Sequence, residues 1–187
     1  MKTINQQLYK LQLIQLEHDE KYHKDISNLN LHHRLNHLVL HFAKYAGRFW
    51  ELEQNKERWC GNDLKKLIID TFIISLSACN TLNIYLDKVL TEDNLSISNL
   101  FELGKSLEEG NKNIQLNTLK QFSIYVGNMA KACESLDRLE NISFRDIMID
   151  NVILISNLTL SMAFKHKIDL YTSMQIRLRE VEDKSIF

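Results

Sequence analysis

The residues best suited to chemistry in this 187-residue chain are four carboxylates between residues 130 and 158. Glu134 and Asp137 are three residues apart, and Asp146 and Asp150 are four apart. Each spacing places two side chains on one face of a helix. Two antiparallel helices that carry these pairs would direct four oxygen ligands toward one place, which is the coordination that a hard divalent cation such as Mg²⁺ requires. The spacing therefore predicts a magnesium site at Glu134, Asp137, Asp146 and Asp150.

Asp70 is a fifth candidate ligand. It lies in the middle of segment 64–86, which is apolar on nearly every side, and Asp150 lies in a similarly apolar segment, 144–164. A carboxylate in such surroundings needs a cation, a hydrogen-bond donor or a raised pKa. We therefore expect Asp70 and Asp150 to be buried, and each to meet either a metal ion or a basic group.

Simpler roles compete with metal binding at several of these positions. Ser143 followed three residues later by Asp146 is typical of a capping box at a helix start, which would explain Asp146 without a metal. Asp137 can pair with a neighbouring base on a solvated helix face, and Arg177 can pair with Glu180 in the same way.

Histidines provide two further candidates for metal binding. His33, His37 and His41 are four residues apart, and two histidines at that spacing can hold a transition metal. No cysteine or carboxylate lies near them in the sequence, so a polar, partly buried helix face is the favoured interpretation. The dipeptide His18-Asp19 resembles the metal-binding pair of HD phosphohydrolases, which also need an upstream histidine. This chain has none.

These residues must be positioned by helices. The chain has no proline and only five glycines, which favours long helices with few sharp turns. We predict an all-α fold, a helical bundle of about six to seven helices that forms a single domain over residues 1–187. Apolar periodicity places the helices at residues 4–24, 28–53, 64–86, 99–109, 115–139, 144–164 and 170–182.

Composition excludes several function classes. The net charge is −1 without a basic block, so nucleic-acid binding is not expected. Three widely spaced cysteines without a CxxC pair predict free thiols in a reducing, cytoplasmic location. The N-terminus has no continuous apolar segment of a signal peptide. The most apolar run, Leu67 to Leu76, contains Asp70 and is too short to span a bilayer, so no membrane association is expected.

The order of features repeats along the chain. A first half at about 28–95 and a second half at about 114–184 follow the N-terminal helix. LNHLVLHFAKYAGRFWELE aligns without gaps to QFSIYVGNMAKACESLDRL, Asp70 aligns with Asp150, and NIYLDKV matches KIDLYTSM. Two diverged helical hairpins packed as one bundle explain this order. Chance similarity between two amphipathic hairpins is the alternative.

This pattern resembles the MazG-like all-α nucleoside triphosphate pyrophosphohydrolases. The acid-bearing helices carry the resemblance, together with the segment that follows them, KHKIDLYTSMQIRLREVE at residues 165–182. The resemblance implies a dimer that uses Mg²⁺ to convert an NTP or dNTP to a nucleoside monophosphate and pyrophosphate. It implies Glu134 and Asp150 as the main catalytic ligands, with Asp137, Asp146 and Asp70 as further metal candidates. Lys131 and Arg177 would contact phosphate oxygens.

The chain departs from the family pattern at several positions. In the second half, the first acid of the family's ExxE segment falls on Lys131, and the glutamate of the ExxD segment falls on Ile147. In the first half, Tyr45 and Arg48 replace the ExxE acids, and Leu67 replaces the glutamate of ExxD. Two functions are therefore expected in competition: an active pyrophosphohydrolase, or a catalytically degenerate helical module that binds a nucleotide, another small phosphorylated ligand or a protein.

Overall fold

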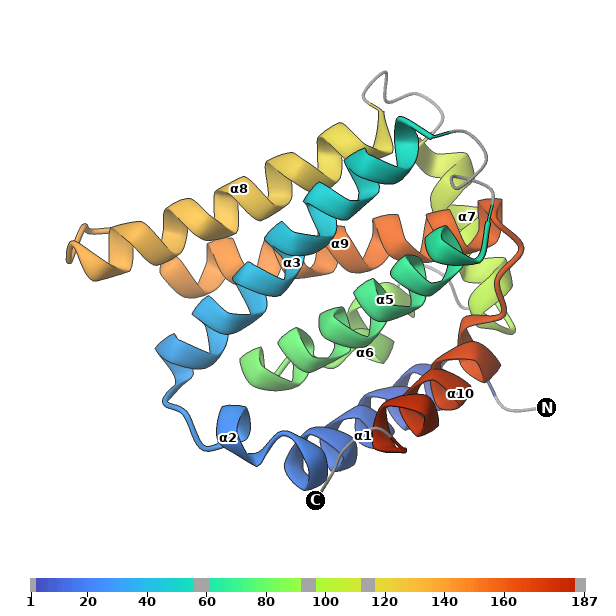
Figure 1. The fold of residues 1–187 in the computed structure, drawn as a ribbon, viewed down its shortest axis with the longest axis horizontal. Helices are drawn as coiled ribbons and strands as arrows, with labels where there is room; N and C mark the ends of the chain where they lie inside the picture. Colours follow the sequence, from blue (N-terminus) through green and yellow to red (C-terminus); the bar gives the residue numbers. More distant parts are fainter. Residues whose placement is uncertain (1–2, 56–60, 92–96, 112–116, 184–187) are drawn as a thin grey trace.

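The chain folds into a bundle in which all regular secondary structure of the described residues is α-helical, which confirms the predicted fold class. The structure, a computed structural model, describes residues 3–55, 61–91, 97–111 and 117–183. The helices are α1 (Ile4–Tyr22), α2 (Lys24–Ser27), α3 (Leu31–Glu53), α5 (Asn62–Leu82), α6 (Leu86–Thr91), α7 (Leu100–Asn111), α8 (Thr118–Asp137), α9 (Phe144–Lys165) and α10 (Leu170–Glu182) (Figure 1).

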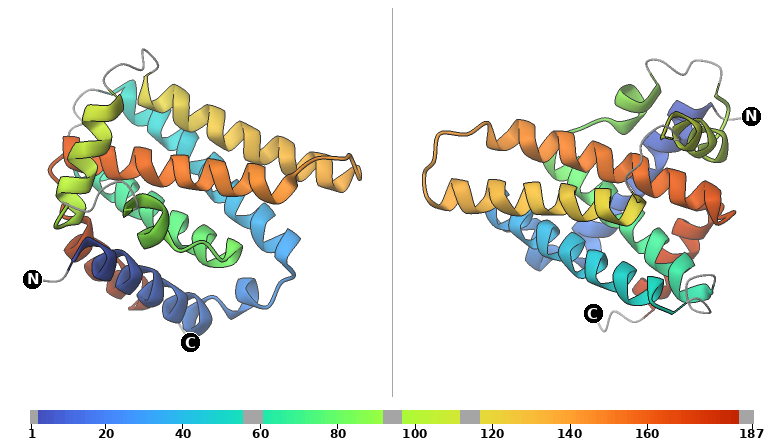
Figure 2. Two further views of the ribbon diagram at one scale, coloured as in Figure 1. Left: turned by 180° about the vertical axis from the view of Figure 1, so that it is seen from behind. Right: turned by 90° about the horizontal axis from the view of Figure 1, so that it is seen from above.

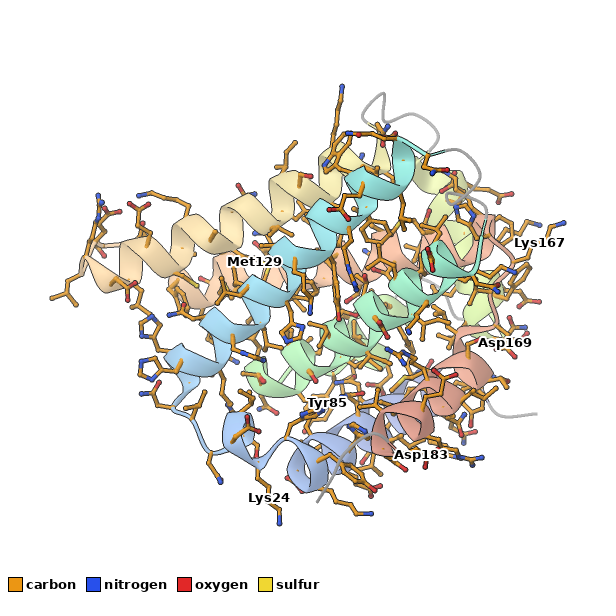
Figure 3. The ribbon with its side chains drawn as sticks, in the orientation of Figure 1. Lys24, Tyr85, Met129, Lys167, Asp169 and Asp183 are labelled. Carbon is orange, nitrogen blue, oxygen red and sulfur yellow. The ribbon has the colours of Figure 1, made fainter. Side chains whose placement is uncertain are left out.

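α9 forms the centre of the bundle. It runs antiparallel to α8 in a long hairpin and packs against α5 and α7 as well (Figure 2). α3 lies against both α5 and α8, and Met129, midway along α8, is fully buried near α3 (Figure 3). α1 and α10 lie side by side along the opposite edge of the molecule and pack on α5. The C-terminal helix therefore returns to the N-terminal one.

α9 is long and apolar enough to cross a membrane by length and composition. Within the molecule, 61 % of its most apolar stretch is buried. Its contacts with α5, α7 and α8 account for this burial, as expected for the core helix of a bundle.

Most predicted helix ends agree with the structure to within a few residues, and two differences have clear local causes. α3 begins later than predicted because residues 24–27 form the separate α2, and the Asn30 side chain caps α3 by accepting a hydrogen bond from the His33 N–H at 3.0 Å. The predicted helix 64–86 is divided into α5 and α6 at Asn83, which has a left-handed backbone conformation with φ 56°. The predicted capping box at residues 143–146 is wrong. Ser143 occupies the N-cap position of α9, but its side chain makes no capping hydrogen bond.

The two halves share the same chain reversal after their central helices. Asn83 after α5 and Lys167 after α9 both have positive φ, 56° and 54°. In each case the following isoleucine donates its N–H to the carbonyl five residues earlier: Ile84 to Cys79 at 2.8 Å, and Ile168 to Ala163 at 2.9 Å. These are the 6→1 hydrogen bonds of a Schellman motif. Leu139 after α8 has the same positive φ of 56°, and the Glu140 N–H donates to the Ser135 carbonyl at 2.9 Å, so this reversal ends three helices of the described residues.

Asn83 and Lys167 begin the segments NIYLDKV and KIDLYTSM, and the same offset of 84 residues pairs two buried serines. Ser77 of α5 corresponds to Ser161 of α9, and each hydroxyl donates to an acid on an adjacent helix, Asp19 of α1 and Glu108 of α7 respectively. Asp70 then corresponds to Leu154, not to Asp150. The predicted pairing of Asp70 with Asp150 is thus displaced by about one helical turn.

α7 approaches α9 closely at Gly104. A Cβ at this position would lie 2.5 Å from the Leu160 backbone oxygen and 3.1 Å from the Phe164 Cβ. Neither neighbour is the end of a flexible side chain, so any larger residue would separate the two helices. The glycine is therefore required by packing.

Gly104→Ala is expected to lower the free energy of unfolding by about 1–3 kcal/mol, as overpacked cores do. The loss should appear even though alanine is favoured over glycine in a helix by about 0.5–1 kcal/mol. Urea denaturation followed by circular dichroism measures the change. Gly127→Ala in α8 is the matched control, since a Cβ there meets nothing within 4 Å, and it should leave stability equal or higher. Destabilisation of both variants to the same extent would contradict the packing explanation.

Candidate ligand-binding cavity

The four acids predicted to bind magnesium lie near the turn of the α8–α9 hairpin. Glu134 and Asp137 are in the last turn of α8, and Asp146 and Asp150 are in the first two turns of α9. All four are exposed. The expectation that Asp150 is buried is therefore wrong, because the buried side of α9 at this level is formed by Met148, by residues 151 and 152 and by the residues that follow them.

Two of these acids pair with bases instead of facing the other acids. The Glu134 carboxylate lies 3.1 Å from Lys131 Nζ and 3.0 Å from Arg138 Nη2, and the hydrogen bond from Lys131 is the main cause of its lowered pKa. Asp137 lies 3.1 Å from His32 Nε2. Among the described residues, no three of the four predicted ligands bring their oxygens within 4.8 Å of one another. Their role in metal binding remains a prediction.

Asp70 faces a basic group from another part of the chain. Its two oxygens accept hydrogen bonds from Arg177 Nε at 2.7 Å and Nη2 at 3.3 Å, which joins α5 to α10. The two side chains are only 15 % and 16 % exposed. Arg177 also donates to Glu180 at 3.0 Å, as predicted. Of the two partners expected for Asp70, a metal or a base, the structure contains the base.

A cavity of about 440 Å³, partly open to solvent, lies beside this ion pair. It is lined by residues of α1, α2, α3, α5 and α10, and these helices can be followed in Figure 1. Apolar side chains such as Leu38, Ile73 and Ile74 form part of its wall. The remaining wall is polar and unusually rich in histidine. Its polar residues include Gln15, His18, Asp19, His23, Arg34, His37, His41, Tyr45, Asp70, Ser77, Asn80 and Arg177.

Three polar groups in the cavity wall have no hydrogen-bond partner. Both ring nitrogens of His18 are unpaired although the residue is only 5 % exposed. The Gln15 Oε1 and the Arg34 Nε are buried and unpaired as well. Buried polar atoms nearly always have a partner, because leaving them unpaired away from water is unfavourable. The residues that carry these atoms line the cavity, but the atoms themselves have almost no accessible surface, so a ligand or water would reach them only after a side chain moved.

The predicted histidine ridge on α3 is divided between the cavity and the surface. The His37 and His41 rings lie 4.7 Å apart and line the cavity, whereas His33 is exposed and does not. Burial, followed by the positive charge of Lys44, lowers the pKa of His41 to about 4. His41 is therefore a neutral imidazole at pH 7, able to donate one hydrogen bond and accept another.

Asp19 is held rigidly in the same wall. Gln15 Nε2 donates to its Oδ1 at 2.8 Å, and the Ser77 hydroxyl donates to its Oδ2. Burial raises the pKa of Asp19 despite these two hydrogen bonds. His18, Asp19 and His23 together form a group in which one ligand atom from each residue lies within 4.8 Å of the others. The sequence analysis missed His23, although it lies in the predicted helix 4–24 and four residues after Asp19, a spacing that could have identified it.

Chemically, the cavity combines arginine, imidazole and carboxylate groups next to an apolar wall, which suits a small polar ligand with an apolar part. Comparison of the sequence with protein-family models and curated proteins, and of the fold with solved structures, finds no match. The geometry of the cavity and the chemistry of its residues are therefore the basis for assigning a function.

Proposed function

We propose that this protein is a binding module that takes a nucleotide or another small phosphorylated compound into the cavity between α1, α3, α5 and α10. The observation that carries the proposal is the cavity itself, about 440 Å³ in volume, with arginine, histidine and carboxylate side chains in its wall. Its volume falls within the roughly 300–1,000 Å³ typical of small-molecule sites.

Arg34 is the group best placed to bind a phosphate. Arg34 lines the cavity, its Nη1 donates to the Ser27 carbonyl at 3.4 Å, and its Nε is inaccessible, so a phosphate would meet the terminal nitrogens. A guanidinium group presents paired N–H donors that match two oxygens of a phosphate. Arg177, by contrast, is already engaged by two carboxylates, so it closes the cavity wall more than it offers free donors.

The resemblance to MazG-like proteins supports binding at this place. In that family the two helices of a hairpin carry the metal-binding acids, and here the corresponding helices of the first half are α3 and α5. Tyr45 stands at an acid position and lines the cavity, and Asp70 is neutralised by Arg177. In the second half the acids are exposed, and Glu134 is paired with bases. These features favour the degenerate binding module over magnesium-dependent hydrolysis.

Thermal unfolding in the presence of nucleoside mono-, di- and triphosphates, each with and without Mg²⁺, tests the proposal. A ligand at about 100 times its Kd should stabilise the native state by about 2.7 kcal/mol. We expect stabilisation that does not require Mg²⁺ and is strongly reduced in Arg34→Gln. Arg48→Gln is the matched control, because Arg48 lies exposed on the same helix outside the cavity.

The same panel separates the competing functions. Magnesium-dependent release of pyrophosphate that is lost in Asp150→Asn would establish the hydrolase instead. No stabilisation by any compound of the panel, or equal stabilisation of wild type and Arg34→Gln, would overturn the binding proposal.

A further inference from the structure

Three residues with metal-ligand side chains come together where α1 ends. His18 and Asp19 lie in its last turn, and His23 is the next residue beyond the helix, with its N–H bonded to the Asp19 carbonyl at 2.9 Å. His23 leaves the helical conformation, with φ −126° and ψ 45°. Its ring centroid lies 5.4 Å from that of His18. A ligand atom of Asp19 lies within 4.8 Å of one from each histidine. We propose that His18, Asp19 and His23 bind a divalent transition-metal ion of the zinc type in the cavity wall.

His18 is the strongest independent indication of a ligand. Only 5 % of its surface is exposed, and it lines the cavity. Neither of its ring nitrogens has a hydrogen-bond partner. A metal ion would bind one nitrogen, and the other would then carry the proton.

Asp19 already has the supporting contacts that metal-binding carboxylates usually have. Gln15 Nε2 and the Ser77 hydroxyl each donate to a different oxygen of the carboxylate, which fixes its orientation from α1 and α5. A carboxylate has about four acceptor positions, so each oxygen keeps one that is free to bind a metal. Removing a carboxylate from water is unfavourable unless a cation is near, and a metal ion would supply that charge.

The donor set determines the class of metal. Two imidazoles and one carboxylate suit zinc and related transition metals, whereas magnesium and calcium prefer oxygen ligands alone. At zinc–nitrogen distances of about 2.0–2.1 Å, the ligand atoms of a tetrahedral site lie roughly 3.3 Å apart, so the three side chains must close slightly around the ion. His23 can adjust because it lies outside the helix and is half-buried. Three protein ligands leave a fourth position open to water or to an oxygen of a cavity ligand.

The other histidine pair of the cavity is less suitable. His37 and His41 are one turn apart on α3, but His41 Nδ1 lies 3.3 Å from Lys44 Nζ, and a cation at that distance opposes a second one. No carboxylate joins this pair in a three-residue group among the described residues. The pair is therefore a control for the proposed site.

Titration of the full-length, tag-free and chelator-treated protein with Co²⁺ and with Zn²⁺ tests this inference. Calorimetry should give a stoichiometry of one ion per chain. Bound Co²⁺ should show the visible absorption bands of a four-coordinate, tetrahedral site. His23→Ala and Ser77→Ala should each weaken binding by at least about tenfold, since even supporting residues contribute about 10–100-fold. Two control variants should bind the metal as tightly as wild type does: the double variant His37→Ala/His41→Ala, and His33→Ala.

Two results would overturn the metal site: binding by wild type no tighter than by His23→Ala, or loss of binding in the His37/His41 variant with retention in His23→Ala. Circular dichroism of each variant checks that it is folded. Because the metal alone is titrated, this result is independent of the proposed nucleotide binding. Metal binding without nucleotide binding would leave the metal site standing and remove only the proposed function.

Discussion

Phe122→Ala is expected to lower the free energy of unfolding by about 3–5 kcal/mol, the range for deleting a fully buried phenylalanine. Phe122 of α8 is 1 % exposed and meets two aromatic rings of α3 edge to face. Its ring centroid lies 5.4 Å from that of Phe49 and 6.4 Å from that of Phe42. Such pairs add about 0.5–1.5 kcal/mol beyond the burial of their area. These contacts join the first half of the repeat to the second.

Urea denaturation at an unchanged m-value measures this loss. Ile124→Ala is the control, because Ile124 lies two residues away on the same helix and is 48 % exposed, and its effect should remain below about 1 kcal/mol. Similar losses for the two variants would mean that α3 and α8 are not held together by this aromatic cluster. A lowered m-value would indicate that the two halves unfold separately.

The fold was predictable because its signals are local. The absence of proline and the apolar periodicity define helices whatever their tertiary contacts, and α10 at Leu170–Glu182 agrees with the predicted residues 170–182. Side-chain burial was harder to predict. α9 is apolar on nearly every side, so its sequence does not say which side faces a neighbour. Close to the hairpin turn fewer helices cover it, and Asp150 is therefore exposed.

The cavity could not be predicted because no single helix contains its pattern. Arg177 and Asp70 are 107 residues apart in the sequence, and Ser77 and Asp19 are 58 apart. Spacing rules identify residues that share a face within one helix, as they did for His37 and His41. They give no information on which faces of different helices meet.

Arg177→Leu is expected to lower the free energy of unfolding by about 2 kcal/mol. The change removes two hydrogen bonds to Asp70 and one to Glu180, and it leaves the Asp70 carboxylate, only 15 % exposed, without its cation. Hydrogen bonds to charged groups contribute about 1.5–3 kcal/mol, and a fully buried pair would lose more. Thermal or urea unfolding measures the change. Glu180→Gln is the control: Glu180 is 54 % exposed, so losing its contact with Arg177 should cost less than about 0.5 kcal/mol.

A double-mutant cycle with Asp70→Asn and Arg177→Leu separates the pair from the other contacts of each residue. The combined loss should be smaller than the sum of the single losses by about 1–2 kcal/mol, because the second change removes a group already left unpaired. Arg177→Lys keeps the charge but cannot form the planar two-bond contact, so it should recover only part of the loss. Strict additivity would mean that the pair does not hold α10 to α5. Since Arg177 and Leu178 line the cavity, α10 would then close the cavity through its apolar contacts alone.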